Sequence, residues 1–484
     1  MTPSRTVEAA RSSPAGELER LASLVRTRDT SAAELIERAL SRIAETRDLN
    51  AVVLLRAETA MEEARAADAS VRRGDVSGPL HGLPLLVKDI EDVTGLRTTF
   101  GSALRADSAP ATHDGLVPRR LRGAGAIVVG KTNVPEYAFE GYTANRVFGA
   151  TLNPWNRAWS PGGSSGGSAA SLAAGAAPLA TATDGGGSIR IPAALCGLVG
   201  MKPTHGVIPR DPIPTWMDLS TDGPLAASVA DVRLLLALES GPTPGDPTAQ
   251  LRRWSDPGRR HVAPAHLFAT ERLVQGPPLA PTVVRLFKDA ISILESDFGL
   301  AVEWLPAGIF RSGDADADWF TIAAAETAHE LGRSTVERAL AEGVFEAGFA
   351  RWMTAALEIG TDAYVAARRR RFDYVRELDD LLGEDVVLIT PTLTVPGWTP
   401  EGVVPGRESE APGLPLDVLN TGPINLSGHP AISLPTGRHP DGPPFGLQLV
   451  APRYREDLLL TLAAAVEAVR PWPHVADGFE PFGG

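Results

Sequence analysis

Cysteine is almost absent from this sequence. The 484-residue chain has one, Cys196, which excludes an internal disulfide bond and a cysteine-rich metal site. Cys196 lies in the apolar segment IPAALCGLVG, so we interpret it as a small buried side chain rather than a reactive thiol. The lack of disulfides fits a reducing compartment, and we expect a cytoplasmic protein.

Long apolar runs and an excess of basic charge are also missing. No stretch approaches the roughly 20 apolar residues of a membrane helix, and the N-terminal segment has no apolar core like that of a secretory signal. Acidic residues outnumber basic ones by 59 to 46, and the net charge of -13 works against binding to the phosphate backbone of nucleic acids. We therefore expect neither a membrane nor a nucleic acid as a partner.

Apolar periodicity and turn residues divide the chain into alternating helices and strands. Residues 31–44 predict an amphipathic helix in which Ser31 and Glu34 form a capping box. A short apolar run predicts a buried strand that ends at Lys88. Further strands are expected within 300–306 and 385–392 and in a hairpin of 431–437 with 445–452, and further helices over 281–298, throughout 315–382 and from about 455. This alternation predicts an α/β fold with a mixed sheet.

The segment GAIVVGKT at 125–132 formally matches the phosphate-binding loop G-x-x-x-x-G-K-[ST]. Its four intervening residues, Ala126 to Val129, follow a strand pattern, and Pro135 stands where an unbroken helix should begin. We therefore interpret this segment as a strand and exclude an ATPase. A long surface connection is expected over 236–262.

Two segments rich in glycine and serine carry the strongest chemical signal. They are PGGSSGGSAAS at 161–171 and TDGGGSIRIPA at 183–193. In the second, three glycines precede Ser188, and a helix is expected to start soon after it, with Pro192 at a permitted early position. Such a turn exposes backbone N–H groups, which can stabilise the oxyanion that forms when a nucleophile attacks a carbonyl.

A serine nucleophile needs a base that takes its proton. Among the histidines, His81, His205 and His429 lie in stretches that could be ordered, but none stands in a recognisable Ser-His-Asp motif. The G-x-S-x-G motif is also absent around Ser188. No motif in the sequence supports a histidine as the base, although none excludes it, and lysine is the other candidate.

The motifs GLPLLVKDI, SPGGSSGGSAAS and TDGGGSIRIPAALCGLVGMKPTHG together resemble the amidase signature family over most of the chain. The resemblance implies an α/β fold with a central twisted mixed β-sheet of about eleven strands covered by helices on both faces. It also implies one domain over 1–484, with an N-terminal helical segment 1–70, a signature core 80–235 and a remainder 236–484 that holds a helical insertion 315–382. Such enzymes are often homodimers, and they need no metal ion or organic cofactor.

Carried over residue by residue, the resemblance implies a Ser-cisSer-Lys triad. Ser188 is then the nucleophile, Lys88 is the base, and Ser164, after a cis peptide bond from Gly163, relays the proton between them. Lys88 must be neutral to accept a proton, and the apolar run before it supplies the burial that lowers the pKa of a lysine. The implied oxyanion hole consists of the backbone N–H groups of Gly185, Gly186, Gly187 and Ser188.

Several other residues receive expected roles. The family often has a side chain at the position of Gly185, so the oxyanion hole is expected to be looser here. Asp184 and Arg190 are expected to form a structural ion pair. Scaffold roles are expected for Asp89, Asn133 and Glu136, and contacts to the substrate for Gly163, Tyr137, Tyr142, Trp216 and Met217.

The sequence thus predicts a hydrolase that cleaves the C–N bond of a small uncharged aryl or alkyl amide through an acyl-enzyme. A carbamate or ester hydrolase with the same triad is an alternative, because all these substrates have an acyl carbon attacked through one oxyanion. A glutaminase-type subunit of a tRNA-dependent amidotransferase complex is another. The acidic charge and the proline-rich stretch 395–418 favour a free-standing enzyme.

Overall fold

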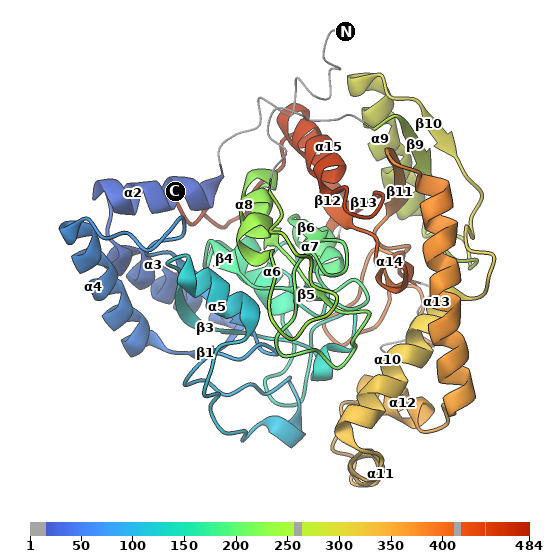
Figure 1. Cartoon of the computed structure of the whole chain (residues 1–484), viewed down its shortest axis with the longest axis horizontal. Helices are drawn as coiled ribbons and strands as arrows, with labels where there is room; N and C mark the ends of the chain where they lie inside the picture. The colour runs from blue at the N-terminus through green and yellow to red at the C-terminus, as the bar shows by residue number, and fades with distance from the viewer. Residues whose placement is uncertain (1–15, 256–263, 411–417, 441) are drawn as a thin grey trace.

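The computed structural model describes residues 16–255, 264–410, 418–440 and 442–484 (Figure 1). The predicted connection 236–262 and the proline-rich stretch 395–418 lie partly outside these residues. None of the described helices is both long and apolar enough to cross a membrane.

The strands form two mixed sheets and a short ribbon. The first sheet has the order β1-β3-β2-β4, formed by β1 (Val52–Leu55), β3 (Ile127–Thr132), β2 (Pro84–Lys88) and β4 (Leu179–Ala180). The second has the order β10-β9-β11-β13-β12-β6-β8, formed by β10 (Val302–Trp304), β9 (His266–Ala269), β11 (Val386–Pro391), β13 (Pro444–Val450), β12 (Ala431–Arg438), β6 (Val199–Lys202) and β8 (Leu225–Ala226). In the ribbon, β5 (Thr183–Asp184) pairs antiparallel with β7 (Thr221–Asp222).

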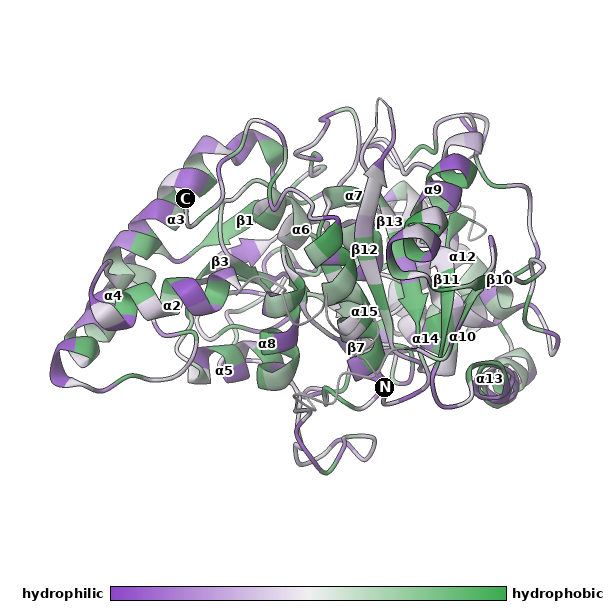
Figure 2. Cartoon of the chain, turned by 90° about the horizontal axis from the view of Figure 1, so that it is seen from above, coloured by the Kyte–Doolittle hydropathy of each residue, from purple (hydrophilic) through white to green (hydrophobic). Residues whose placement is uncertain are grey.

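The α/β class with mixed strand directions is confirmed. Within the described residues, the expected sheet is divided where β4 of the first sheet packs beside β8 of the second without forming a ladder. Every residue of β2, β3 and β13 is buried, so helices and loops cover both faces of each sheet. Figure 2 shows hydrophobic residues on β11 and β12 at the centre and hydrophilic residues on the outer helices.

Helices surround the sheets. They are α2 (Glu17–Thr27), α3 (Ala32–Glu45), α4 (Ala57–Arg73), α5 (Leu116–Gly123), α6 (Gly166–Ala173), α7 (Arg190–Cys196), α8 (Val229–Glu239), α9 (Pro281–Phe298), α10 (Ala315–Leu331), α11 (Arg333–Ala341), α12 (Ala347–Ala356), α13 (Thr361–Leu382), α14 (Gly422–Ser427) and α15 (Glu456–Val469), with three short 3-10 turns at Arg47–Leu49, Ala103–Arg105 and Glu136–Ala138. The predicted capping box of α3 is confirmed, because Ser31 Oγ accepts from the Glu34 N–H at 3.1 Å and Glu34 accepts from the Ser31 N–H at 2.8 Å.

The prediction of continuous helix over 315–382 is wrong in one respect. The segment forms four helices, α10 to α13, interrupted near Gly332, Gly343 and Gly360. Gly332 and Gly343 have φ values of 80° and 62°, which glycine adopts without the steric cost that a side chain brings. In Figure 1 these helices lie at the opposite side of the molecule from α2, α3 and α4.

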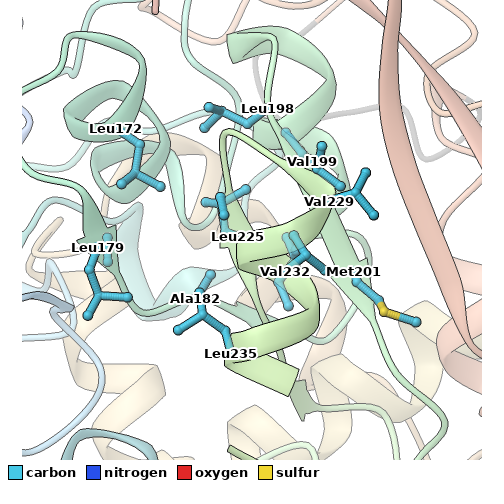
Figure 3. Packing of buried hydrophobic residues seen from close by; sticks show 14 of the residues in the cluster. Leu172, Leu179, Ala182, Leu198, Val199, Met201, Leu225, Val229, Val232 and Leu235 are labelled. Carbon is cyan, nitrogen blue, oxygen red and sulfur yellow. The ribbon is translucent and has the colours of Figure 1, made fainter. Parts of the chain in front are cut away.

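A continuous hydrophobic core joins the two sheets. Figure 3 shows Leu172 of α6 and Leu179 of β4 near side chains of β6, β8 and α8, among them Val199, Leu225 and Val232. These residues are all at most 5% exposed. The seam between the sheets is therefore filled by packed apolar side chains, which fixes the glycine-rich segments around it.

Candidate active site

Lys88 is the last residue of β2 and is completely buried. Its backbone N–H donates to Thr181 Oγ1 at 2.9 Å, which fixes the end of the strand. Its side-chain Nζ lies 2.8 Å from Ser164 Oγ and 2.8 Å from Thr183 Oγ1. The predicted strand therefore ends by placing a lysine amine among hydroxyl groups in the interior.

Ser164 follows Gly163 through a cis peptide bond, as the resemblance implied. A Cβ atom at Gly163 would lie 2.7 Å from the carbonyl oxygens of Glu140 and Tyr142, so only glycine fits there. The next residue, Ser165, donates its N–H to the carbonyl oxygen of Ser188 at 3.2 Å. This bond holds the two glycine-rich segments together.

The three residues of the expected triad meet in one region. Ser164 is 1% exposed and Ser188 is 8% exposed, and both line one cavity, while Ser164 also contacts the amine of Lys88. Burial lowers the pKa of Lys88 to about 7, against the opposing effect of the acidic groups Glu91, Asp184 and Asp222. A lysine with this pKa is largely unprotonated just above neutrality, as a base must be.

Side chains from distant parts of the chain hold the glycine turn before Ser188 by donating hydrogen bonds to its carbonyl oxygens. Trp319 Nε1 donates to the Gly185 oxygen at 2.7 Å, and Thr421 Oγ1 donates to the Gly186 oxygen at 2.6 Å. The Gly187 N–H donates to Asp184 at 2.7 Å, so this N–H is already used within the protein. No described residue accepts a hydrogen bond from the N–H groups of Gly185, Gly186 and Ser188, and these donors remain for an oxyanion.

The missing side chain at Gly185 does not leave an open space. A Cβ atom there would lie 2.4 Å from a ring carbon of Trp216, and one at Gly186 would lie 2.5 Å from a ring carbon of Trp319. At Gly187, where φ is +129°, an added Cβ would lie 2.2 Å from Thr421 Oγ1. These contacts argue against the looser oxyanion hole that the sequence suggested.

Asp184 and Arg190 form the ion pair that the sequence predicted. Both side chains are fully buried, with Asp184 Oδ1 and Arg190 Nη2 2.9 Å apart. Burial alone would raise the pKa of Asp184, but Arg190 and Asn425 hold it well below its usual range. Because Asp184 also accepts from the N–H groups of Gly187 and Ile189, the pair fixes the turn that carries Ser188.

The cavity beside Ser188 measures about 400 Å³. Of the predicted substrate contacts, Tyr137 and Trp216 line it, together with Phe100. Burial raises the pKa of the Tyr137 hydroxyl group, which keeps it neutral. The cavity is also lined by ionisable side chains: Glu91, Asp92, Arg105, Arg210, Asp211, Asp222 and Glu330.

The other three predicted contacts lie elsewhere. Gly163 is enclosed by backbone, and Tyr142 is 2% exposed, in a separate hydrophobic cluster with Trp398, because its ring packs against Gly402. Met217 is 45% exposed and lines a neighbouring cavity of about 680 Å³. The two cavities share Ile213, Pro214, Thr215 and Glu330 on their walls.

The expected scaffold residues are buried and bonded. Asp89 forms an ion pair of 2.9 Å with Lys131. Asn133 donates to Thr151 Oγ1 at 3.0 Å, and Glu136 accepts from Ser102 Oγ at 2.6 Å. In the described part of the chain, no group of three His, Cys, Asp or Glu side chains could hold a metal ion.

Several site residues were not found from the sequence. Glu91 stands three positions after Lys88, and burial raises its pKa to about 8. Asp222 is paired across the ribbon with Thr183, and burial raises its pKa to about 6. Thr183 stands directly before DGGGS, and this position could have indicated its contact with Lys88. Nothing in the local sequence indicates that Arg210 and Trp319 lie at the site.

The comparisons with known proteins show the family to which the chain is related. The model of the Amidase family matches residues 34–460. An acylamidase from Rhodococcus erythropolis is 34% identical over 481 residues, covering 93% of this chain and 95% of that protein. A glutamyl-tRNA(Gln) amidotransferase subunit from Picosynechococcus sp. is 33% identical over 475 residues, covering 92% and 96%. The crystal structure of a bacterial aryl acylamidase of the amidase signature family has a TM-score of 0.81 at 28% identity, covering 93% of this chain and 95% of that chain.

Proposed function

Because the chain belongs to the amidase signature family of amide-hydrolysing enzymes, we propose that it cleaves the C–N bond of a small uncharged aryl or alkyl amide. The observation that carries this proposal is the contact of 2.8 Å between the buried amine of Lys88 and Ser164, beside the cavity that Ser188 lines. A neutral amine in this place can take a proton from a hydroxyl group. The site thus has a nucleophile, a relay and a base.

In the proposed mechanism, Ser188 Oγ attacks the acyl carbon while its proton passes to Ser164, whose own proton passes to Lys88. Ser164 then gives a proton to the leaving nitrogen and regains one from Lys88, so the amine departs neutral. Water attacks the acyl-enzyme through the same relay, which releases the carboxylic acid and restores Ser188.

The negative charge on the acyl oxygen is proposed to be stabilised by backbone donors. Gly185, Gly186 and Ser188 offer N–H groups that no described residue uses, and Trp319 and Thr421 fix the two glycine carbonyls of the same turn. Fixed donors need no reorganisation when the charge develops. The Gly187 N–H, committed to Asp184, takes a positioning role in this scheme.

The substrate class follows from the cavity wall and from the relatives. Phe100, Tyr137 and Trp216 provide aromatic surface for an aryl or alkyl group. Two relatives are named acylamidase and aryl acylamidase, which supports an acyl amide as the substrate. We also propose that the chain is a single domain, because one hydrophobic cluster joins Leu18 near one end to Phe482 near the other.

Two other functions are kept as alternatives. Carbamates and esters offer the same acyl carbon, so the proposed triad would act on them as well. The similarity to a glutamyl-tRNA(Gln) amidotransferase subunit favours the second alternative, in which the chain releases ammonia from glutamine within a complex. A free-standing hydrolase and an amidotransferase subunit differ in whether the purified chain is active without a partner.

The test is product release from aryl amides, alkyl amides, esters, carbamates and glutamine, measured for the purified chain and its Ser188→Ala variant. We expect aryl or alkyl amides to be cleaved and the variant to lose at least about a thousandfold in kcat. Ser171→Ala is the control, because Ser171 lies in the other glycine-rich segment, the one that carries Ser164, and its hydroxyl group donates to the Gly167 oxygen within α6. Turnover that survives Ser188→Ala, or activity on glutamine alone, contradicts the proposal.

A further inference from the structure

Glu91 is tied to Lys88 by a closed ring of hydrogen bonds. The backbone N–H of Lys88 donates to Thr181 Oγ1 at 2.9 Å, and Thr181 Oγ1 donates in turn to the carboxyl group of Glu91. The backbone N–H of Glu91 donates back to the Lys88 carbonyl oxygen at 3.0 Å. Both backbone groups of Lys88 are thus held in one ring with Glu91 and Thr181.

Thr181 fixes this ring to the first sheet. It directly follows β4, and its N–H donates to the Leu86 oxygen of β2 at 3.0 Å. Thr181 is buried, so water does not compete for its hydroxyl group. The ring therefore fixes the backbone at the end of β2, from which the Lys88 side chain reaches Ser164.

Glu91 and Lys88 also influence each other's charge. Burial raises the pKa of Glu91 and lowers the pKa of Lys88, because a protein interior disfavours both charged forms. Lys88 opposes the effect of burial on Glu91, and Glu91 opposes it on Lys88 more strongly than Asp184 or Asp222 does. A carboxylate at Glu91 and an ammonium group at Lys88 therefore stabilise each other.

The carboxyl group of Glu91 acts on the amine from a distance. Among the described residues, no carboxylate forms an ion pair with the Lys88 amine, whose side-chain contacts are Ser164 and Thr183. A direct ion pair would favour the protonated amine, which cannot act as a base. A carboxyl group beyond contact distance leaves the amine free and still stabilises its charged form.

The other ionisable groups near Glu91 come from three different elements. Burial has the largest effect on the pKa of Glu91, while Asp222 of β7 raises it further and Lys131 of β3 lowers it. Glu239 of α8 is buried, and its own pKa is raised by burial and by Asp222 and Glu91. Lys131 already has an ion pair of 2.9 Å, so Lys88 is the cation whose charge Glu91 can still balance.

We propose that Glu91 is a positioning residue for the base. It holds the backbone of Lys88 through Thr181, and it stabilises the ammonium group that forms when Lys88 takes the proton of Ser164. In this scheme Glu91 exchanges no proton with the substrate. The inference rests on the proposed amidase function, but its test measures the reactivity of Ser188 and needs no turnover of an amide.

The test measures the rate at which phenylmethanesulfonyl fluoride labels Ser188, from acid to alkaline pH, by mass spectrometry. Labelling needs a base that takes the serine proton, because a bond from Oγ to sulfur forms as fluoride leaves. Glu91→Gln keeps an acceptor for Thr181 and removes the charge. We expect the inflection of the rate to move to lower pH by about one unit or more, and the plateau above it to fall about tenfold.

Two variants separate the charge of Glu91 from its hydrogen bond. Thr181→Val removes the bridging hydroxyl group and keeps both charges, so the rate should fall about tenfold while the inflection stays in place. Asp92→Asn changes the neighbouring carboxyl group, which accepts from Thr98 and not from Thr181. This variant should leave the inflection in place.

The outcomes are distinguishable. An inflection that does not move in Glu91→Gln overturns the proposal. If Glu91→Gln does not fold, Thr181→Ser is compared with Thr181→Val, since serine keeps the bridging hydroxyl group; equal labelling rates of these two variants overturn the proposal, and a slower Thr181→Val supports it. Labelling with the expected pH profile but without turnover of any amide supports the role of Glu91 and contradicts the amidase function instead.

Discussion

The side-chain nitrogen of Lys88 lies 2.8 Å from Ser164 Oγ, and neither residue is more than 1% exposed. Thr183 provides two acceptors for the same nitrogen, its Oγ1 at 2.8 Å and its backbone oxygen at 3.5 Å. A neutral amine has two N–H donors and one lone pair. With both donors directed to Thr183, the lone pair is left for the proton of Ser164, which gives the relay a direction.

The first prediction concerns this lone pair. Lys88→Met keeps the length of the side chain and removes the base, so kcat should fall by about a thousandfold or more. Thr183→Val removes one acceptor but keeps the contact between Lys88 and Ser164, and a loss of about tenfold is expected. Steady-state kinetics measure both, with circular dichroism to confirm folding. A Lys88→Met enzyme that keeps a tenth of the activity would show that lysine is not the base.

The second prediction concerns pH. Because Lys88 must be unprotonated and burial lowers its pKa to about 7, kcat/KM should rise roughly tenfold per pH unit below neutrality and level off above it. Asp222 raises the pKa of Lys88, so Asp222→Asn should move the inflection to lower pH. Asp92→Asn, also on the cavity wall, is the control and should leave the inflection in place. An inflection that stays or moves upward in Asp222→Asn contradicts this electrostatic account.

Local pattern was enough to predict the elements that carry the triad. The apolar run before Lys88, bounded by glycine and proline, predicted a buried strand, and the three glycines before Ser188 predicted a turn; the structure has both. The roles of Lys88 and Ser164 came from the family motifs, since no spacing shows that residues 76 positions apart form a hydrogen bond.

The rest of the site depends on tertiary contacts. Trp319 reaches the Gly185 oxygen from α10, 134 positions away, and Asp222 meets Thr183 only when the ribbon forms. Tyr142 was placed in the substrate pocket because it is aromatic and near the motif, yet its ring packs against Gly402 instead. Sequence patterns give the face of a strand or helix, but not which distant surface covers it.

The third prediction concerns the ion pair beneath Ser188. Asp184→Asn leaves Arg190 charged and fully buried without its counter-ion, so the free energy of unfolding should fall by about 3–5 kcal/mol. Glu337→Gln breaks the exposed pair with Arg333 and should change the free energy of unfolding by less than about 1 kcal/mol. Denaturant unfolding measures both. Equal effects of the two variants would mean that the buried pair does not stabilise the fold.

The fourth prediction separates the oxyanion turn from the cluster that supports it. Trp319→Phe removes the N–H that holds the Gly185 oxygen, so the N–H groups of the turn lose part of their alignment and kcat should fall about three- to tenfold. Trp352→Phe is the same substitution in the same hydrophobic cluster, but Trp352 Nε1 donates to Glu140 and does not touch the turn. Both variants should lower the unfolding midpoint, and only Trp319→Phe should lower kcat while KM changes little. If both lower kcat equally, general loosening of the cluster explains the loss and the bond from Trp319 has no specific role in catalysis.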